Sequence, residues 1–88
     1  MKNQQPTISI YSISAVAKSV RANADKHAEK IVYVNRKPKY EISEYNGKTW
    51  AREYGKPQSV SYYPISSRYA KKSEIIETIT SYEEAYND

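Results

Sequence analysis

The sequence predicts an α+β fold, a single domain over residues 1–88. In it a mostly antiparallel sheet of four to five short strands carries one packed helix and an acidic C-terminal helix. Three observations lead to this prediction. Short segments rich in Ile, Val, Tyr and Thr recur between turn residues in the first two thirds of the chain. An Ala-rich segment near the start has helical spacing, and residues 73–88 contain five acidic residues but no Lys or Arg.

The first elements are a strand and a helix. Residues 7–11 alternate isoleucine with polar or outward-facing positions, which predicts a short strand. Ser12 or Ser14 is a suitable N-cap for the helix that follows. From residue 13 to about residue 30, apolar side chains recur every three or four positions with charged side chains between them, so we expect an amphipathic helix.

Two strands are expected next, around a basic turn. Residues 31–34 are apolar and β-branched, which predicts a strand. It should end before residues 35–38, because Pro38 fixes its own backbone and extends the residue before it. Residues 40–45 predict the next strand.

A hairpin signal follows at once. Asn46 and Gly47 both tolerate the positive φ angles of a type I′ turn, so residues 48–54 should return antiparallel to the strand before them. A further strand is expected over 59–63. Pro64 should end that strand or mark an edge of the sheet.

The last element is expected to be a helix capped by Ser73, with Glu74 in the first turn favoured by the helix dipole. Its β-branched residues leave a strand possible for part of it. An 88-residue chain buries only about 60 to 65% of its unfolded surface. We therefore expect one side of this helix to form the interface of a homodimer. The side chains on that side are Ile75, Ile79, Tyr82 and Tyr86.

Charge is distributed unevenly along the chain, whose formal net charge is +4. Residues 31–72 carry nine Lys or Arg against three Glu, whereas residues 73–88 are purely acidic. A basic body with an acidic tail indicates a polyanionic partner for the body, or a basic protein partner for the tail. The alternative is an ordinary solvated surface that keeps a small protein soluble.

Tyrosines and cations are interleaved in the middle of the chain, where seven of the ten tyrosines lie. Flat rings beside cations are typical of surfaces that bind nucleic acid, and also of protein interfaces. With a two-residue turn in the hairpin, one face carries such side chains together and the other is apolar enough for the core. The first face holds Glu41, Ser43, Tyr45, Lys48, Trp50, Arg52 and Tyr54, and the second holds Tyr40, Ile42, Thr49 and Ala51.

The first hairpin face is therefore a candidate stacking platform for bases, at about 1 to 3 kcal/mol each. The alternative is that Trp50 is the largest residue of the core. The basic turn at residues 36–39 is a second candidate, and such lysine-rich turns are usually solvated surface. The predicted nucleic-acid contacts are Arg36, Lys37, Lys39, Tyr45, Lys48, Trp50, Arg52, Tyr54 and Lys56.

Signals for catalysis are poor. There is no cysteine, the one histidine is His27, and no His, Asp or Glu set has the spacing of metal ligands. We therefore expect no enzyme, metal or cofactor. A small metal-independent ribonuclease using Lys, Arg, Tyr or Glu is the one enzymatic alternative. The start of the sequence has no signal-peptide pattern and no segment could span a membrane, so a cytoplasmic location is expected.

Residues 31–43, Ile-Val-Tyr-Val-Asn-Arg-Lys-Pro-Lys-Tyr-Glu-Ile-Ser, resemble an element of Phd/YefM-type antitoxins in which a basic turn and a proline join two strands. The preceding strand at 9–12 and the Ala-rich helix stand in a similar order, so the resemblance covers residues 9–43. That family pairs an N-terminal DNA-binding dimer with a C-terminal segment that neutralises a toxin. The resemblance thus implies an antitoxin or autoregulator, and it identifies no individual functional residue.

The expected function is non-catalytic binding of nucleic acid in a regulatory, antitoxin-like role. RNA or single strands are preferred over duplex DNA, because stacking needs unpaired bases. The alternative is a small inhibitor of the kind carried by phages and mobile elements. Its tyrosine-rich sheet or acidic helix would then block a groove of a host protein.

Overall fold

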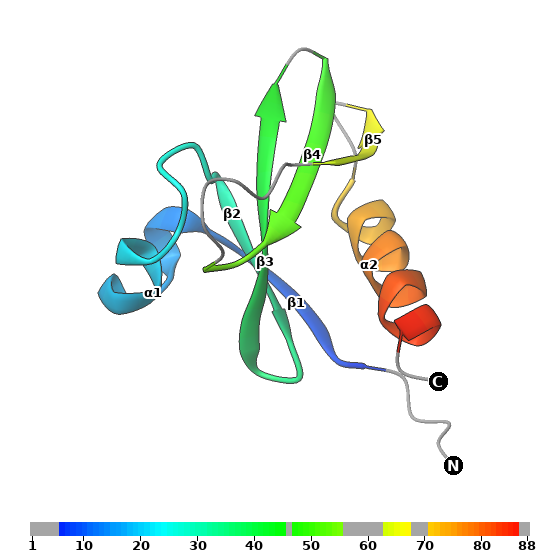
Figure 1. The fold of residues 1–88 in the computed structure, drawn as a ribbon, viewed down its shortest axis with the longest axis horizontal. Coiled ribbons are helices and arrows are strands. Elements are labelled where there is room, and N and C mark those ends of the chain that lie inside the picture. The colour runs from blue at the N-terminus through cyan, green and yellow to red at the C-terminus, as the bar shows by residue number, and fades with distance from the viewer. Residues whose placement is uncertain (1–5, 46, 56–62, 68–70, 87–88) are drawn as a thin grey trace.

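The computed structural model describes residues 6–45, 47–55, 63–67 and 71–86, and it confirms the α+β fold class (Figure 1). Five strands lie side by side in chain order, each antiparallel to the next. The strands are β1 (Ile8–Ser12), β2 (Lys30–Val34), β3 (Lys37–Tyr45), β4 (Lys48–Glu53) and β5 (Tyr63–Ser67). The helical elements are the 3-10 helix η1 (Ile13–Ala15) and the α-helices α1 (Lys18–Ala22) and α2 (Lys72–Tyr86).

The turn between β2 and β3 is shorter than expected. Asn35 and Arg36 have φ angles of 52° and 71°, the pair of positive values that defines a tight type I′ hairpin turn. The third strand therefore begins at Lys37 rather than at residue 40. Pro38 lies inside it, where the register between β2 and β3 is irregular, and proline is tolerated at such irregularities.

The hairpin of β3 and β4 has the predicted register, in which Tyr45 faces Lys48 and Ser43 faces Trp50. Gly47 has the positive φ that the turn requires, and Asn46 lies outside the described residues. Pro64 falls within β5 at the edge of the sheet, as expected for a residue without a backbone donor. Of the predicted strand at 59–63, residues 59–62 lie outside the described part of the chain.

The expectation of a long helix over residues 13–30 is wrong. The chain forms only η1 and the five-residue α1 there, and residues 23–29 leave the helical path. One cause is local, because the carboxylate of Asp25 accepts the backbone N–H of His27 at 2.9 Å, a turn that competes with helix formation. Ser12 stands at the start of η1 without a side-chain cap.

The sheet is covered on both faces, with α1 and α2 on opposite sides (Figure 1). Helix α2 covers the larger core. Its members are Ile10, Val32, Val34, Tyr40, Ile42, Ala51, Ile75 and Ile79. On the opposite face Ile31 is fully buried, and Val16 and Ala28 from the segment before β2 are buried too. The helix that packs across the main core is thus the C-terminal one, because residues 13–30 do not form a long helix.

Two of the four residues predicted to form the homodimer interface are buried inside the protomer. Ile75 and Ile79 pack against the chain's own sheet, so their assignment to a protein interface is wrong. Tyr82 is 36% exposed, and the side chain of Tyr86 is outside the described set. The buried carboxylate of Glu83 accepts hydrogen bonds from the Tyr40 hydroxyl and from Lys39 Nζ, which fixes α2 to β3. The homodimer stays a prediction.

None of the helices in the described segments is long and apolar enough to cross a membrane.

Candidate functional site

The hairpin tip, which we define as Tyr45, Lys48 and Trp50, carries exposed aromatic and cationic groups. Tyr45 is 68% exposed, Lys48 is also exposed, and Trp50 is half-buried. The indole Nε1 of Trp50 donates a hydrogen bond to the carbonyl oxygen of Tyr45 at 2.8 Å. Trp50 is therefore held against the strand end, neither sealed in the core nor fully free.

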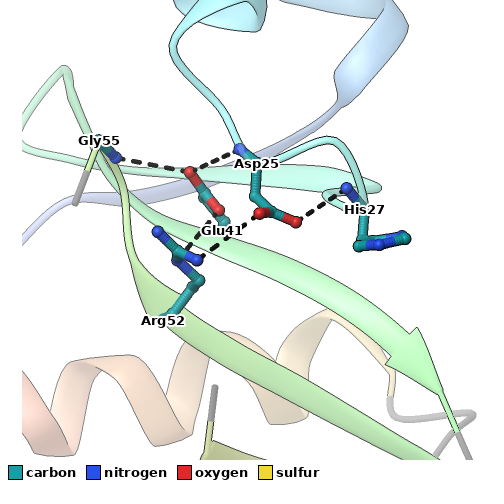
Figure 2. Close-up of polar contacts among 5 residues, drawn as sticks. All are labelled: Asp25, His27, Glu41, Arg52 and Gly55. Carbon is teal, nitrogen blue, oxygen red and sulfur yellow. Dashed lines mark hydrogen bonds and ion pairs between the residues drawn. The ribbon is translucent and has the colours of Figure 1, made fainter. Parts of the chain in front are cut away.

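Arg52 lies on the same face but does not reach solvent. It is 4% exposed, and its Nη1 and Nε lie 3.7 Å from Asp25 Oδ1 and 3.5 Å from Glu41 Oε1 (Figure 2). The expectation that Arg52 faces nucleic acid is wrong. Residues 13–29 fold back over this half of the hairpin and cover it, which a helix running straight to residue 30 would not do.

The buried ions form a structural unit, the Glu41 cluster of Asp25, Glu41 and Arg52 (Figure 2). Glu41 Oε2 accepts the backbone N–H groups of Asp25 at 3.1 Å and of Gly55 at 3.5 Å. Burial raises the pKa of Glu41, while the two N–H groups and the charge of Arg52 oppose that rise. The cluster therefore holds two loops, one containing Asp25 and the other Gly55, against the centre of the sheet.

Two further predicted contacts also have structural partners. The hydroxyl of Tyr54 donates to the carbonyl oxygen of Val20 at 3.0 Å, which attaches α1 to the end of β4. Lys39 Nζ lies 2.9 Å from Glu83 Oε1 on α2, so this cation is directed away from the exposed rings. Lys56 lies outside the described residues.

The basic turn opens onto a pocket, which we call the turn pocket. It has a volume of about 340 Å³ and lies on the face opposite α2. Its lining consists of Ser9, Tyr11, Ala15, Val16, Ala17, Tyr33 and Arg36. Sequence reasoning singled out Arg36 but missed Tyr11 and Ser9. The alternation of β1 could have indicated them, since both fall on the face opposite Ile8 and Ile10.

The structure separates the two candidate surfaces. The turn pocket lies at the start of β3 and the hairpin tip at its end, and β3 has nine residues. At a rise of about 3.3 Å per residue the first and last Cα atoms of β3 are about 26 Å apart. The predicted contacts thus form two patches rather than one platform.

Searches against models of protein families, curated proteins and solved structures found no match. The resemblance to Phd/YefM-type antitoxins therefore stays a prediction. Within residues 6–45, 47–55, 63–67 and 71–86 there is no group of three or more His, Cys, Asp or Glu arranged to hold a metal ion.

Proposed function

We propose that this protein binds single-stranded nucleic acid, with RNA preferred, and acts as a non-catalytic regulator of the antitoxin-like kind. The observation that carries the proposal is the exposure of a ring near a cation at two places on the sheet. Tyr45, at the end of β3 opposite Lys48, is 68% exposed, and Tyr11 on β1, which lines the turn pocket together with Arg36, is 48% exposed. Unpaired bases stack on such rings, and RNA-binding proteins use this mode for loops and single strands.

The state of the cations supports the same proposal. Arg36, Lys37 and Lys48 are exposed and form no ion pair among the described residues. Arg52 and Lys39, by contrast, are already paired with carboxylates. Three cations are therefore free to bind phosphates, and each phosphate contact releases a counterion when it forms.

The salt dependence of binding tests this proposal. With three phosphate contacts on a single strand, log affinity against log salt should have a slope of about −2. We would measure it by fluorescence anisotropy with a labelled oligouridylate of about 16 nucleotides, long enough to reach both patches. Lys48→Ala should make the slope shallower by about 0.7, the share of one contact.

Lys72→Ala is the matched control, because it removes an exposed cation of α2, the helix that packs on the face of the sheet opposite the hairpin tip and the turn pocket. It should leave the slope unchanged. No binding of oligouridylate at low salt would contradict the proposal. The same samples, kept without metal, test the ribonuclease alternative, since shortened RNA would indicate turnover.

An inhibitor of a host protein is the second candidate, and the exposed face of α2 favours it. Glu74, Glu77 and Glu84 are all exposed on this helix, which makes it an acidic surface for a basic partner. Tagged protein purified after nuclease treatment should then retain one host protein. Loss of that protein in Glu77→Lys, but not in Lys48→Ala, would favour inhibition over nucleic-acid binding.

A further inference from the structure

We propose that the turn pocket is a subsite for one unpaired nucleotide, whose base stacks on Tyr11 and whose phosphate binds the guanidinium of Arg36. The inference rests on the proposed function, and it assigns one position of the bound strand to a defined cavity. It involves residues of β1 and of the β2–β3 turn, far along the sheet from the hairpin tip.

The size of the pocket suits a single nucleotide. About 340 Å³ is at the lower end of the range for small-molecule sites. The floor is the pair of strands β1 and β2, and residues 15–17 form one wall. A duplex would not enter such a cavity, whereas a base turned out of a single strand would.

The aromatic residues of the pocket, Tyr11 and Tyr33, hold each other in a fixed orientation. The rings of Tyr11 and Tyr33 pack edge to face, with centroids 5.3 Å apart and planes at 88°. This contact fixes the orientation of both rings, yet Tyr11 remains 48% exposed. The hydroxyl of Ser9, also in the lining, adds a group that can donate to or accept from a base edge.

The cation of the pocket, Arg36, has an unusual backbone conformation. Arg36 has a φ of 71° in the second central position of the turn, where glycine is the favoured residue. An arginine is strained there, and strained residues cluster at sites of function. Arg36 forms no ion pair or side-chain hydrogen bond within the part of the chain that the structure describes.

Charge complementarity selects an anionic ligand. Of the described side chains that line the pocket, none is acidic, so the charge of Arg36 is not neutralised locally. A guanidinium binds phosphate through two parallel hydrogen bonds, and its flat face can also stack on a base. A ring and a guanidinium in one cavity match the base and phosphate of one nucleotide.

Arg36→Gly tests the inference, because its two expected effects have opposite signs. Glycine relieves the strain at positive φ, so the melting temperature should rise by roughly 4 °C. Loss of the guanidinium should weaken binding of a labelled uridylate of about 4 nucleotides roughly 10-fold. The readouts are fluorescence anisotropy and thermal unfolding of the same preparations.

Lys37→Ala is the matched control, since it removes the neighbouring exposed cation, which does not line the pocket. It should weaken binding by less than about 3-fold, as expected for one phosphate contact. Tyr11→Leu should weaken binding about 10-fold, and Tyr82→Leu on α2 should not change it. An oligonucleotide that lacks its bases should bind the wild type and Tyr11→Leu equally.

The outcomes separate this inference from the function on which it rests. If Arg36→Gly and Lys37→Ala weaken binding equally, or if the abasic strand binds as well as the uridylate, the nucleotide subsite is overturned while RNA binding stands. If the wild type does not bind any oligonucleotide at low salt, both are overturned. A lower melting temperature for Arg36→Gly would contradict the strain argument.

Discussion

Three ionisable side chains meet inside this molecule, in the Glu41 cluster, where two carboxylates face one guanidinium. Charges removed from water are costly unless they are paired and hydrogen-bonded, and Glu41 gains two backbone N–H donors in addition to Arg52. At the scale of the residue, Arg52 is buried in this cluster and does not contact nucleic acid. The cluster instead holds the loops that contain Asp25 and Gly55 against the sheet. The charge of Glu41 is therefore linked to the stability of the fold.

This linkage predicts a pH dependence. The pKa of Glu41 in the folded protein is raised by burial above 4.5, its ordinary value. The folded state therefore binds the proton more tightly than the unfolded state. The stabilisation from protonated Glu41 should be complete below the unfolded pKa and should be lost as the pH rises through the folded pKa.

Glu41→Gln isolates this effect. The free energy of unfolding of the wild type minus that of the variant should fall as the pH rises from about 4.5, and then level off. Urea unfolding at a series of pH values measures it. Glu77→Gln, an exposed position on α2, is the control and should change stability by less than about 0.5 kcal/mol. If the free energy of unfolding of the wild type minus that of Glu41→Gln rises with pH, the pKa of Glu41 is not raised in the folded protein.

At the scale of the element, α2 starts without a good N-cap. The carbonyl oxygen of Lys71 accepts the N–H of Ile75 at 3.1 Å, which puts Lys71 in the cap position, and Ser73 lies inside the first turn. The expectation that Ser73 caps the helix is therefore wrong. Glu74 Oε1 accepts the N–H of Lys71 at 3.0 Å, so half of a capping box is present.

Lys71→Ser completes that capping box and should stabilise the protein by about 1 kcal/mol. The carbonyl oxygen of Lys71 already accepts the N–H of Glu74 at 2.9 Å, and a serine hydroxyl in the cap position adds a side-chain acceptor for the first turn that the lysine side chain cannot supply. Chemical denaturation measures the gain. Lys72→Ser, one position later, changes the charge equally without supplying a cap, and an equal gain in that variant would show that capping is not the cause.

At the scale of the whole molecule, the sheet positions its two candidate patches at opposite ends of β3. The Glu41 cluster, with the chain segment around Asp25, covers the part of that face between the two patches. A strand of nucleic acid that reaches both patches must pass over or around this covered segment. Binding should therefore depend on the length of the strand.

A length series of oligouridylates from about 4 to about 16 nucleotides tests this arrangement. Affinity should rise steeply once one strand reaches both patches, because the second contact then becomes intramolecular. Lys48→Ala should weaken binding of the long strands and leave the shortest ones, held by the turn pocket, nearly unchanged. A smooth rise in affinity with no effect of the variant on any length would indicate one diffuse surface.

Local patterns predicted most of the sheet. The alternation of β1, the turn residues around β3 and the pairing of Tyr45 with Lys48 all depend on neighbouring residues, so they could be derived from sequence. The candidate site was predicted in part. Arg36 and Tyr45 are exposed as expected, whereas the role of Tyr11 depends on a partner ring twenty-two residues away, which no local pattern reveals.

By itself the amino-acid sequence determined the α+β class, the hairpin register and the basic character of the central strands, because these follow from side-chain period, turn chemistry and composition. Only the tertiary structure decided which charged groups meet solvent. Arg52 is inside and Arg36 is outside because a chain segment distant in sequence folds over one and leaves the other open. Burial is a property of the assembled fold, and charge alone does not determine it.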